Sequence, residues 1–129
     1  MRSTSPRVVR LYHGTDVDSA KDLEADLRLD PALAAERHID GELGFYLATA
    51  EADAEFFAAR RGLGRVLVFH LSHHALEELE TAGAERQPVP GGRPPYFEGA
   101  EIFVPVDLFA LFNKLAEEGE IGVGTWPHG

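Results

Sequence analysis

Apolar residues along the chain form short β-rich runs separated by stretches with helical spacing. Residues 8–12 and 44–49 are rich in β-branched and aromatic side chains, as strands usually are. Residues 65–71 form a nearly continuous apolar run, which is typical of a strand covered on both faces. A fourth short run covers residues 101–104, directly before Pro105. The pattern therefore predicts four strands.

Between these runs, apolar residues recur every three or four positions, which is the period of a helix. The helices predicted from this spacing cover residues 17–29, 50–59, 73–81 and 108–119. Thr49 and Ser72 are expected to cap the second and third of them. Residues 88–95 contain four prolines and should form a surface loop, and residues 120–129 could add a final edge strand.

Strands interleaved with short helices predict a compact α+β fold. The chain shows no internal repeat or linker, so residues 1–129 are expected to form a single domain. No glycine-rich βα turn of the dinucleotide-binding type occurs, which disfavours a doubly wound parallel sheet. A compact α+β sheet is therefore expected.

Composition and charge remove several classes of function. Twelve Lys and Arg residues against 22 Asp and Glu residues give a net charge of −10, which disfavours direct nucleic-acid binding. The chain has no cysteine, so it has no disulfide framework and no thiol chemistry. No apolar run is long enough for a membrane span and no secretory segment is evident, so a cytoplasmic location is expected. The histidines at 70, 73 and 74 lack a clear ligand geometry, and no metal is expected.

Three positions could carry chemistry. His13 precedes Gly14 at the predicted exit of a strand, although a lone turn histidine is more often structural. Tyr46 and Phe57 could form a slot for a flat ring, or simply pack in the core. Glu101 opens a strand, where a carboxylate can stabilise a developing positive charge; composition alone makes Glu98 an equal choice.

Taken in order, these segments resemble a known family. The run Leu11-Tyr12-His13-Gly14-Thr15 is followed by Gly44-Phe45-Tyr46-Leu47-Ala48-Thr49, by Phe57 and by Glu101-Ile102-Phe103-Val104. This order is similar to the histidine, tyrosine, glutamate pattern of the diphtheria-toxin-like and PARP-like ADP-ribosyltransferases. The resemblance implies a compact split mixed β-sheet core with short helices, with NAD as co-substrate in the cleft.

The resemblance also implies roles for single residues. His13 would bond the adenosine-side ribose of NAD, and the Gly14 backbone would hold the nicotinamide carboxamide, with Thr15 beside it. Tyr46 and Phe57 would sandwich the nicotinamide ring. Glu101 would bond the nicotinamide ribose and stabilise the transition state as nicotinamide leaves.

The resemblance leaves partners and competing functions open. Implied partners are an unidentified acceptor of ADP-ribose, expected to be a protein, and a cognate inhibitor if the chain is a bacterial toxin or effector. One alternative is a catalytically inactive binding module of the same fold. Another is an enzyme similar to RNA 2′-phosphotransferases, which the charge of −10 disfavours. Arg60, Arg61 and Arg65 could meet the NAD pyrophosphate, or only complement a helix dipole and solvate a face.

Overall fold

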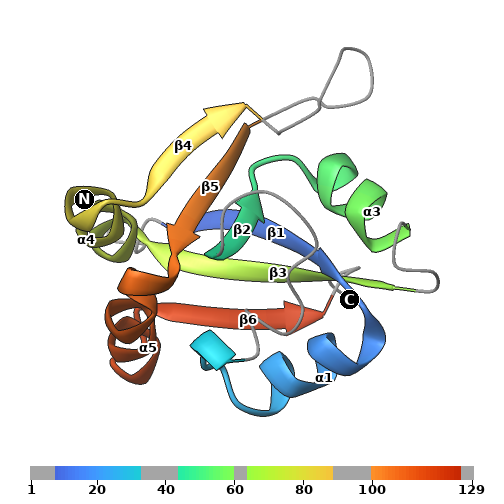
Figure 1. The fold of residues 1–129 in the computed structure, drawn as a ribbon, viewed down its shortest axis with the longest axis horizontal. Helices are drawn as coiled ribbons and strands as arrows, with labels where there is room; N and C mark the ends of the chain where they lie inside the picture. The colour runs from blue at the N-terminus through green and yellow to red at the C-terminus, as the bar shows by residue number, and fades with distance from the viewer. Residues whose placement is uncertain (1–7, 33–43, 60–63, 89–99, 126–129) are drawn as a thin grey trace, which may run out of the picture.

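Six strands form one open sheet in the computed structural model, which describes residues 8–32, 44–59, 64–88 and 100–125 (Figure 1). The strands are β1 (Val8–Thr15), β2 (Gly44–Ala48), β3 (Arg65–Ser72), β4 (Glu85–Pro88), β5 (Ala100–Pro105) and β6 (Ile121–Thr125). Their order across the sheet is β4-β5-β2-β1-β3-β6. Neighbouring strands pair antiparallel at every junction between these described strands.

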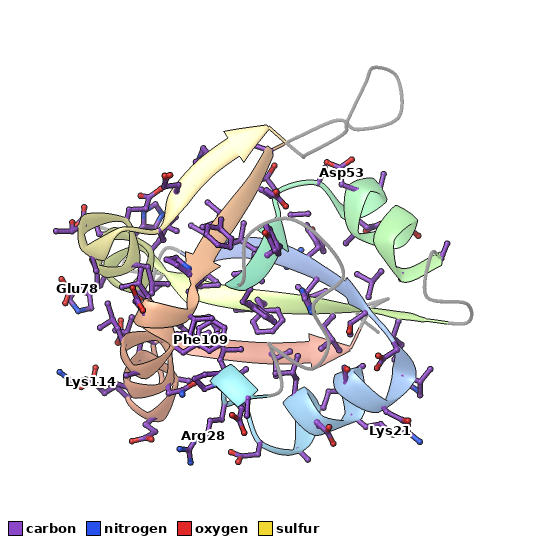
Figure 2. All side chains as sticks on the ribbon, in the orientation of Figure 1. Lys21, Arg28, Asp53, Glu78, Phe109 and Lys114 are labelled. Carbon is purple, nitrogen blue, oxygen red and sulfur yellow. The ribbon has the colours of Figure 1, made fainter. Side chains whose placement is uncertain are left out.

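Short helices cover the sheet in the described part of the chain (Figure 1). They are α1 (Val17–Ala25), α3 (Glu51–Ala59), α4 (His73–Ala82) and α5 (Phe109–Glu117), with a 3-10 turn, η1 (Val106–Leu108), leading into α5. Helix α3 packs on β1, β2 and β3, whereas α1 packs on β3 and β6, α4 on β3 and α5 on β6. Charged side chains on these helices, including Lys21, Glu78 and Lys114, lie at the periphery (Figure 2).

The two faces of the sheet carry different cores. One face presents large leucine and phenylalanine side chains, which pack with buried residues of α1, α4 and α5. We call this the large-residue face. On the other face, Ala48 and Val66 of the sheet form a small cluster with Ala54 and Ala58 of α3, and Tyr12 packs against it. We call this the alanine face.

The junction between β1 and β2 is narrow. Between the described residues of β1 and β2, Tyr12 and Ala48 form a single pair, whereas eight residue pairs join β1 to β3 and five join β2 to β5. The sheet is therefore held least tightly between its two halves, β4-β5-β2 and β1-β3-β6.

The α+β class with short helices is confirmed, but the sheet is antiparallel throughout the described strands and not mixed. Strands β1, β4 and β5 contain polar or charged residues, unlike the nearly continuous apolar runs that are typical of parallel strands. The predicted edge strand at the C-terminal end is confirmed as β6, and the helix predicted to reach residue 29 ends at Ala25. Strand β4 was not predicted. Its Pro88 lies on the edge of the sheet, where a missing N–H is tolerated.

Two of the helices have an N-cap residue whose side-chain oxygen accepts a backbone hydrogen bond. Asp16 accepts a hydrogen bond from the Ser19 N–H (2.6 Å) at the start of α1. Ser72 accepts from the Ala75 N–H (3.0 Å), which confirms its predicted role at α4. The expectation for Thr49 is wrong, because its hydroxyl bonds to the backbone of Ala100 on β5.

In the part of the chain described here, no helix has the length and apolar character of a membrane span.

Candidate functional site

Three adjacent strands carry the residues that the sequence singled out. His13 lies on β1, Tyr46 on the neighbouring β2, and Glu101 on β5, which pairs with the other edge of β2. These segments are far apart in the sequence. The sheet order β5-β2-β1 therefore brings them into one region of the fold.

His13 lies within β1, paired with Leu67 of β3, so its predicted placement in a turn is wrong. The strand continues through Thr15 because Asp16, and not an earlier residue, caps α1. The His13 ring stacks on Phe45 with centroids 4.2 Å apart and meets the edge of Phe69 at 6.2 Å. These contacts belong to the large-residue face.

The His13 ring also bridges the narrow junction. Its Nδ1 lies 2.8 Å from the backbone carbonyl oxygen of Tyr46. A carbonyl can only accept, so Nδ1 carries the proton and donates this hydrogen bond. In a neutral ring, Nε2 is then an acceptor suited to a hydroxyl group.

Tyr46 is half-buried and packs against Phe103, with ring centroids 4.8 Å apart and planes inclined by 37°. Phe103 is directly opposite Tyr46 in the β2–β5 register. The Phe103 ring also lies over Gly44, where an added Cβ would collide with it. Tyr46 is therefore held on one side by a ring that is itself fixed against the backbone of β2.

Glu101 is buried, with 3% of its surface exposed, and lies opposite Ala48 of β2. Ala48 is in turn opposite Tyr12 of β1, so Tyr12, Ala48 and Glu101 form one row across three strands. Residues directly opposite one another point to the same face of a sheet, so this row belongs to the alanine face. Glu98 lies outside the described residues.

Gly14 permits close packing of α3. A Cβ at this position would collide with the backbone oxygen of Ala54 and lie 2.8 Å from the nitrogen of Ala58. Thr15, the last residue of β1, is buried. Phe57 lies on α3, the helix seated over this part of the sheet, and its side chain is outside the description.

The structure brings Tyr46 and Glu101 together but separates the His13 ring from them. Alternation along each strand puts Tyr46, Phe103 and Glu101 on one face. Diagonal neighbours of this kind are about 7 to 8 Å apart. His13 is adjacent to Tyr12 in the strand and therefore points to the opposite face.

Sequence reasoning missed three residues that surround this region, Phe103, Tyr12 and Thr49. The alternation of β5 was a usable signal for Phe103, because residues 101 and 103 must share a face. No local pattern identified Tyr12, whose place depends on the register of β1 with β2. Thr49 precedes a helix and so fitted a cap equally well.

The arginines and the metal-ligating side chains near the site were also compared with the predictions. Arg65, a candidate for the NAD pyrophosphate, forms an ion pair with Glu24 of α1 at 3.3 Å. Arg60 and Arg61 lie outside the described residues. Among the described side chains, no group of three or more His, Asp or Glu residues could hold a metal ion.

Asp53 is a fully buried carboxylate in the first turn of α3, at the end of the helix that faces β5 and β2 in Figure 2. A negative charge at this position complements the positive end of the helix dipole. It supports the orientation of α3 over the alanine face.

Comparisons of the chain with protein-family models, with curated proteins and with solved structures found no match.

Proposed function

We propose that the protein is an NAD-dependent ADP-ribosyltransferase. The observation that carries this proposal is the gathering of His13, Tyr46 and Glu101 on three adjacent strands, with Tyr46 and Glu101 on one face. The narrow β1–β2 junction also agrees with the split sheet that the sequence resemblance implies. Both observations support a fold of the ADP-ribosyltransferase type around the three residues.

NAD is an extended molecule, and the separation of His13 from Tyr46 and Glu101 fits its two ends. The nicotinamide riboside lies on the alanine face, with its ring against Tyr46 and beneath α3, which also carries Phe57. The adenosine-side ribose lies by His13, where Nε2 can accept a hydroxyl hydrogen bond.

Glu101 supplies the anion that the reaction requires. The bond between ribose C1′ and the nicotinamide nitrogen breaks, and its electron pair leaves with nicotinamide. The positive charge that develops on the ribose is stabilised by the carboxylate, which is effective because its surroundings exclude water. The acceptor then adds a nucleophile to C1′ and loses a proton.

The acceptor in this proposal is a macromolecule, with protein as the first class to test. A bacterial toxin or effector of this type would harm the cell that makes it unless an inhibitor is present. Poor recovery of the wild-type protein, with normal recovery of Glu101→Gln from the same host, would support toxicity. Equal recovery of the two would count against it.

Nicotinamide release tests the enzymatic step. Purified protein is incubated with NAD, without and with cell extract, and free nicotinamide is measured by chromatography. We expect Glu101→Gln to bind NAD but to lose about 100-fold or more in kcat, because the charge exists only in the transition state. Full activity of Glu101→Gln together with an inactive Glu98→Gln would transfer the role to Glu98.

Thermal stabilisation by NAD separates binding from turnover. A ligand that binds the native state raises Tm by mass action, and Tyr46→Ala should reduce the shift. A Tm shift without nicotinamide release from the wild type would indicate the inactive binding module. No shift at millimolar NAD and no release would overturn the proposed function.

A further inference from the structure

The end of β2 and the start of β5 are joined by three hydrogen bonds between two residues. The Thr49 N–H donates to the Ala100 carbonyl (2.9 Å), and the Thr49 hydroxyl donates to the same oxygen (3.1 Å). The Ala100 N–H donates to the Thr49 hydroxyl oxygen (2.9 Å). Thr49 thus satisfies both backbone groups of Ala100.

This arrangement replaces part of the regular β-ladder. In an antiparallel hydrogen-bonded pair, each residue donates its N–H to the carbonyl of the other. Here the chain turns out of the sheet after Thr49 to begin α3 at Glu51, and the Thr49 hydroxyl accepts the bond from Ala100. The side chain therefore extends the pairing by one residue beyond the end of β2.

The next residue after Ala100 is Glu101. Glu101 is paired with Ala48 of β2, the residue before Thr49, so the two pairs are consecutive. A buried carboxylate can act on a developing charge only if its backbone holds it within a fraction of an ångström of the productive position. Thr49 fixes the backbone at the first residue of the strand that carries this carboxylate.

We propose that Thr49 is a positioning residue for Glu101. It acts by fixing Ala100, and through it the Glu101 carboxylate, relative to Tyr46 on β2. The inference rests on the proposed function, since it assigns Glu101 its role in NAD cleavage. It adds a residue whose contribution is to kcat and not to the binding of NAD.

The test compares Thr49→Val with Thr49→Ser. Valine keeps the branched shape of threonine but removes the hydroxyl, whereas serine keeps the hydroxyl. For nicotinamide release, we expect Thr49→Val to lower kcat about 10- to 100-fold with KM for NAD within about twofold of wild type. Thr49→Ser should stay within about threefold of wild type in both constants.

Ser72→Ala is the matched control. Ser72 is the last residue of β3, and its hydroxyl accepts from the Ala75 N–H and donates to a Glu120 carboxylate oxygen. It is in register with Val8, four residues along β1 from Tyr12 in the row of Glu101. We expect Ser72→Ala to lower Tm while kcat stays at the wild-type value. A kcat loss in Ser72→Ala equal to that in Thr49→Val would overturn the inference.

A second measurement asks whether Thr49 acts through Glu101. In a Glu101→Gln background, adding Thr49→Val should cause less than about twofold further loss of kcat, because the group that it positions is already altered. If Thr49→Val does not fold, Thr49→Ala is judged by the same criteria. Independent losses that multiply would overturn the inference, as would a Thr49→Ser variant as slow as Thr49→Val.

Failure of the inference is distinct from failure of the proposed function. If the wild type releases nicotinamide and Thr49→Val has the same kcat, only the role of Thr49 is overturned. Absence of release from the wild type, with and without cell extract, overturns the proposed function and this inference with it.

Discussion

The two faces of the sheet are built from side chains of different size. The large-residue face is filled by leucines and phenylalanines, and its rings lie in edge-to-face contacts such as Phe45 with Phe69 at 5.6 Å. The buried cluster between the alanine face and α3 consists of small side chains with Tyr12 packed against it, and the helix backbone approaches Gly14 directly. The first face therefore supplies most of the apolar burial, and the second permits close approach of α3 to β1 at Gly14.

This difference separates stability from the proposed chemistry. Buried apolar area is the main source of stability, and most of it lies with α1, α4 and α5. Tyr46, Phe103 and Glu101 lie on the other face. Mutations among the buried leucines and phenylalanines of the large-residue face should thus affect folding, and mutations at Tyr46 and Glu101 should affect the proposed NAD binding and turnover.

Phe112→Ala should have the largest effect on stability. Phe112 is fully buried on α5, with its ring 5.9 Å from that of Phe45 and 6.4 Å from that of Phe69. We expect the free energy of unfolding to fall by about 3 to 5 kcal/mol, measured by denaturant titration. Exposed Lys114→Ala on the same helix should change it by less than about 0.5 kcal/mol. A loss below about 1 kcal/mol for Phe112→Ala would contradict the assignment of the main core to this face.

Gly14→Ala tests close packing on the alanine face. The new Cβ would meet backbone atoms of Ala54 and Ala58, which no side-chain rotation can relieve. We expect a loss of about 1 to 3 kcal/mol in denaturant titration, typical of overpacking. Gly122→Ala on β6 is the control, because its Cβ would meet nothing within 4 Å. Equal stability of the two variants would show that α3 is not seated on Gly14.

Phe103→Leu tests whether a ring behind Tyr46 matters for the site. An aromatic contact of this kind contributes about 0.5 to 1.5 kcal/mol, which corresponds to a rise of about 2- to 10-fold in KM for NAD. Phe109→Leu, a buried position on α5, should lower stability but leave KM unchanged. If both variants raise KM equally, the two faces are not separable in function.

Glu24→Gln should have the smallest effect. The ion pair of Glu24 with Arg65 joins α1 to β3 at the rim of the large-residue face, and both side chains are partly exposed. We expect less than about 1 kcal/mol of destabilisation in low salt, decreasing as salt is added. An effect that is larger and independent of salt would indicate that this rim is part of the core.

Strand and helix types were predictable from the sequence, because the period of apolar residues reflects which side must be buried. Ser72 was recognised as a cap from local chemistry, and the structure confirms it. The continuation of β1 through His13 was missed because a glycine usually indicates a turn. In the structure, Gly14 instead allows contact with α3, which is distant in the sequence.

The candidate site was predictable as a set of residues but not as a geometry. Nothing local to His13 or Tyr46 indicates that their side chains point to opposite faces, since this depends on register. The role of Thr49 was misassigned for the same reason. A hydroxyl just before a helix is typical of an N-cap. The position of β5, which the sequence does not give, is what directs the Thr49 hydroxyl to the backbone of Ala100.

The narrow β1–β2 junction has a consequence for synthesis of the chain. The β1–β3 pairing needs only residues up to Ser72, whereas β5 is made much later and pairs with β2 and β4. Because segments made earlier can fold first, a ribosome-bound chain can hold His13 and Tyr46 before Glu101 has left the exit tunnel. On the proposed function, we expect NAD cleavage to begin only once β5 has emerged and paired. The incomplete chain should therefore not cleave NAD during its synthesis.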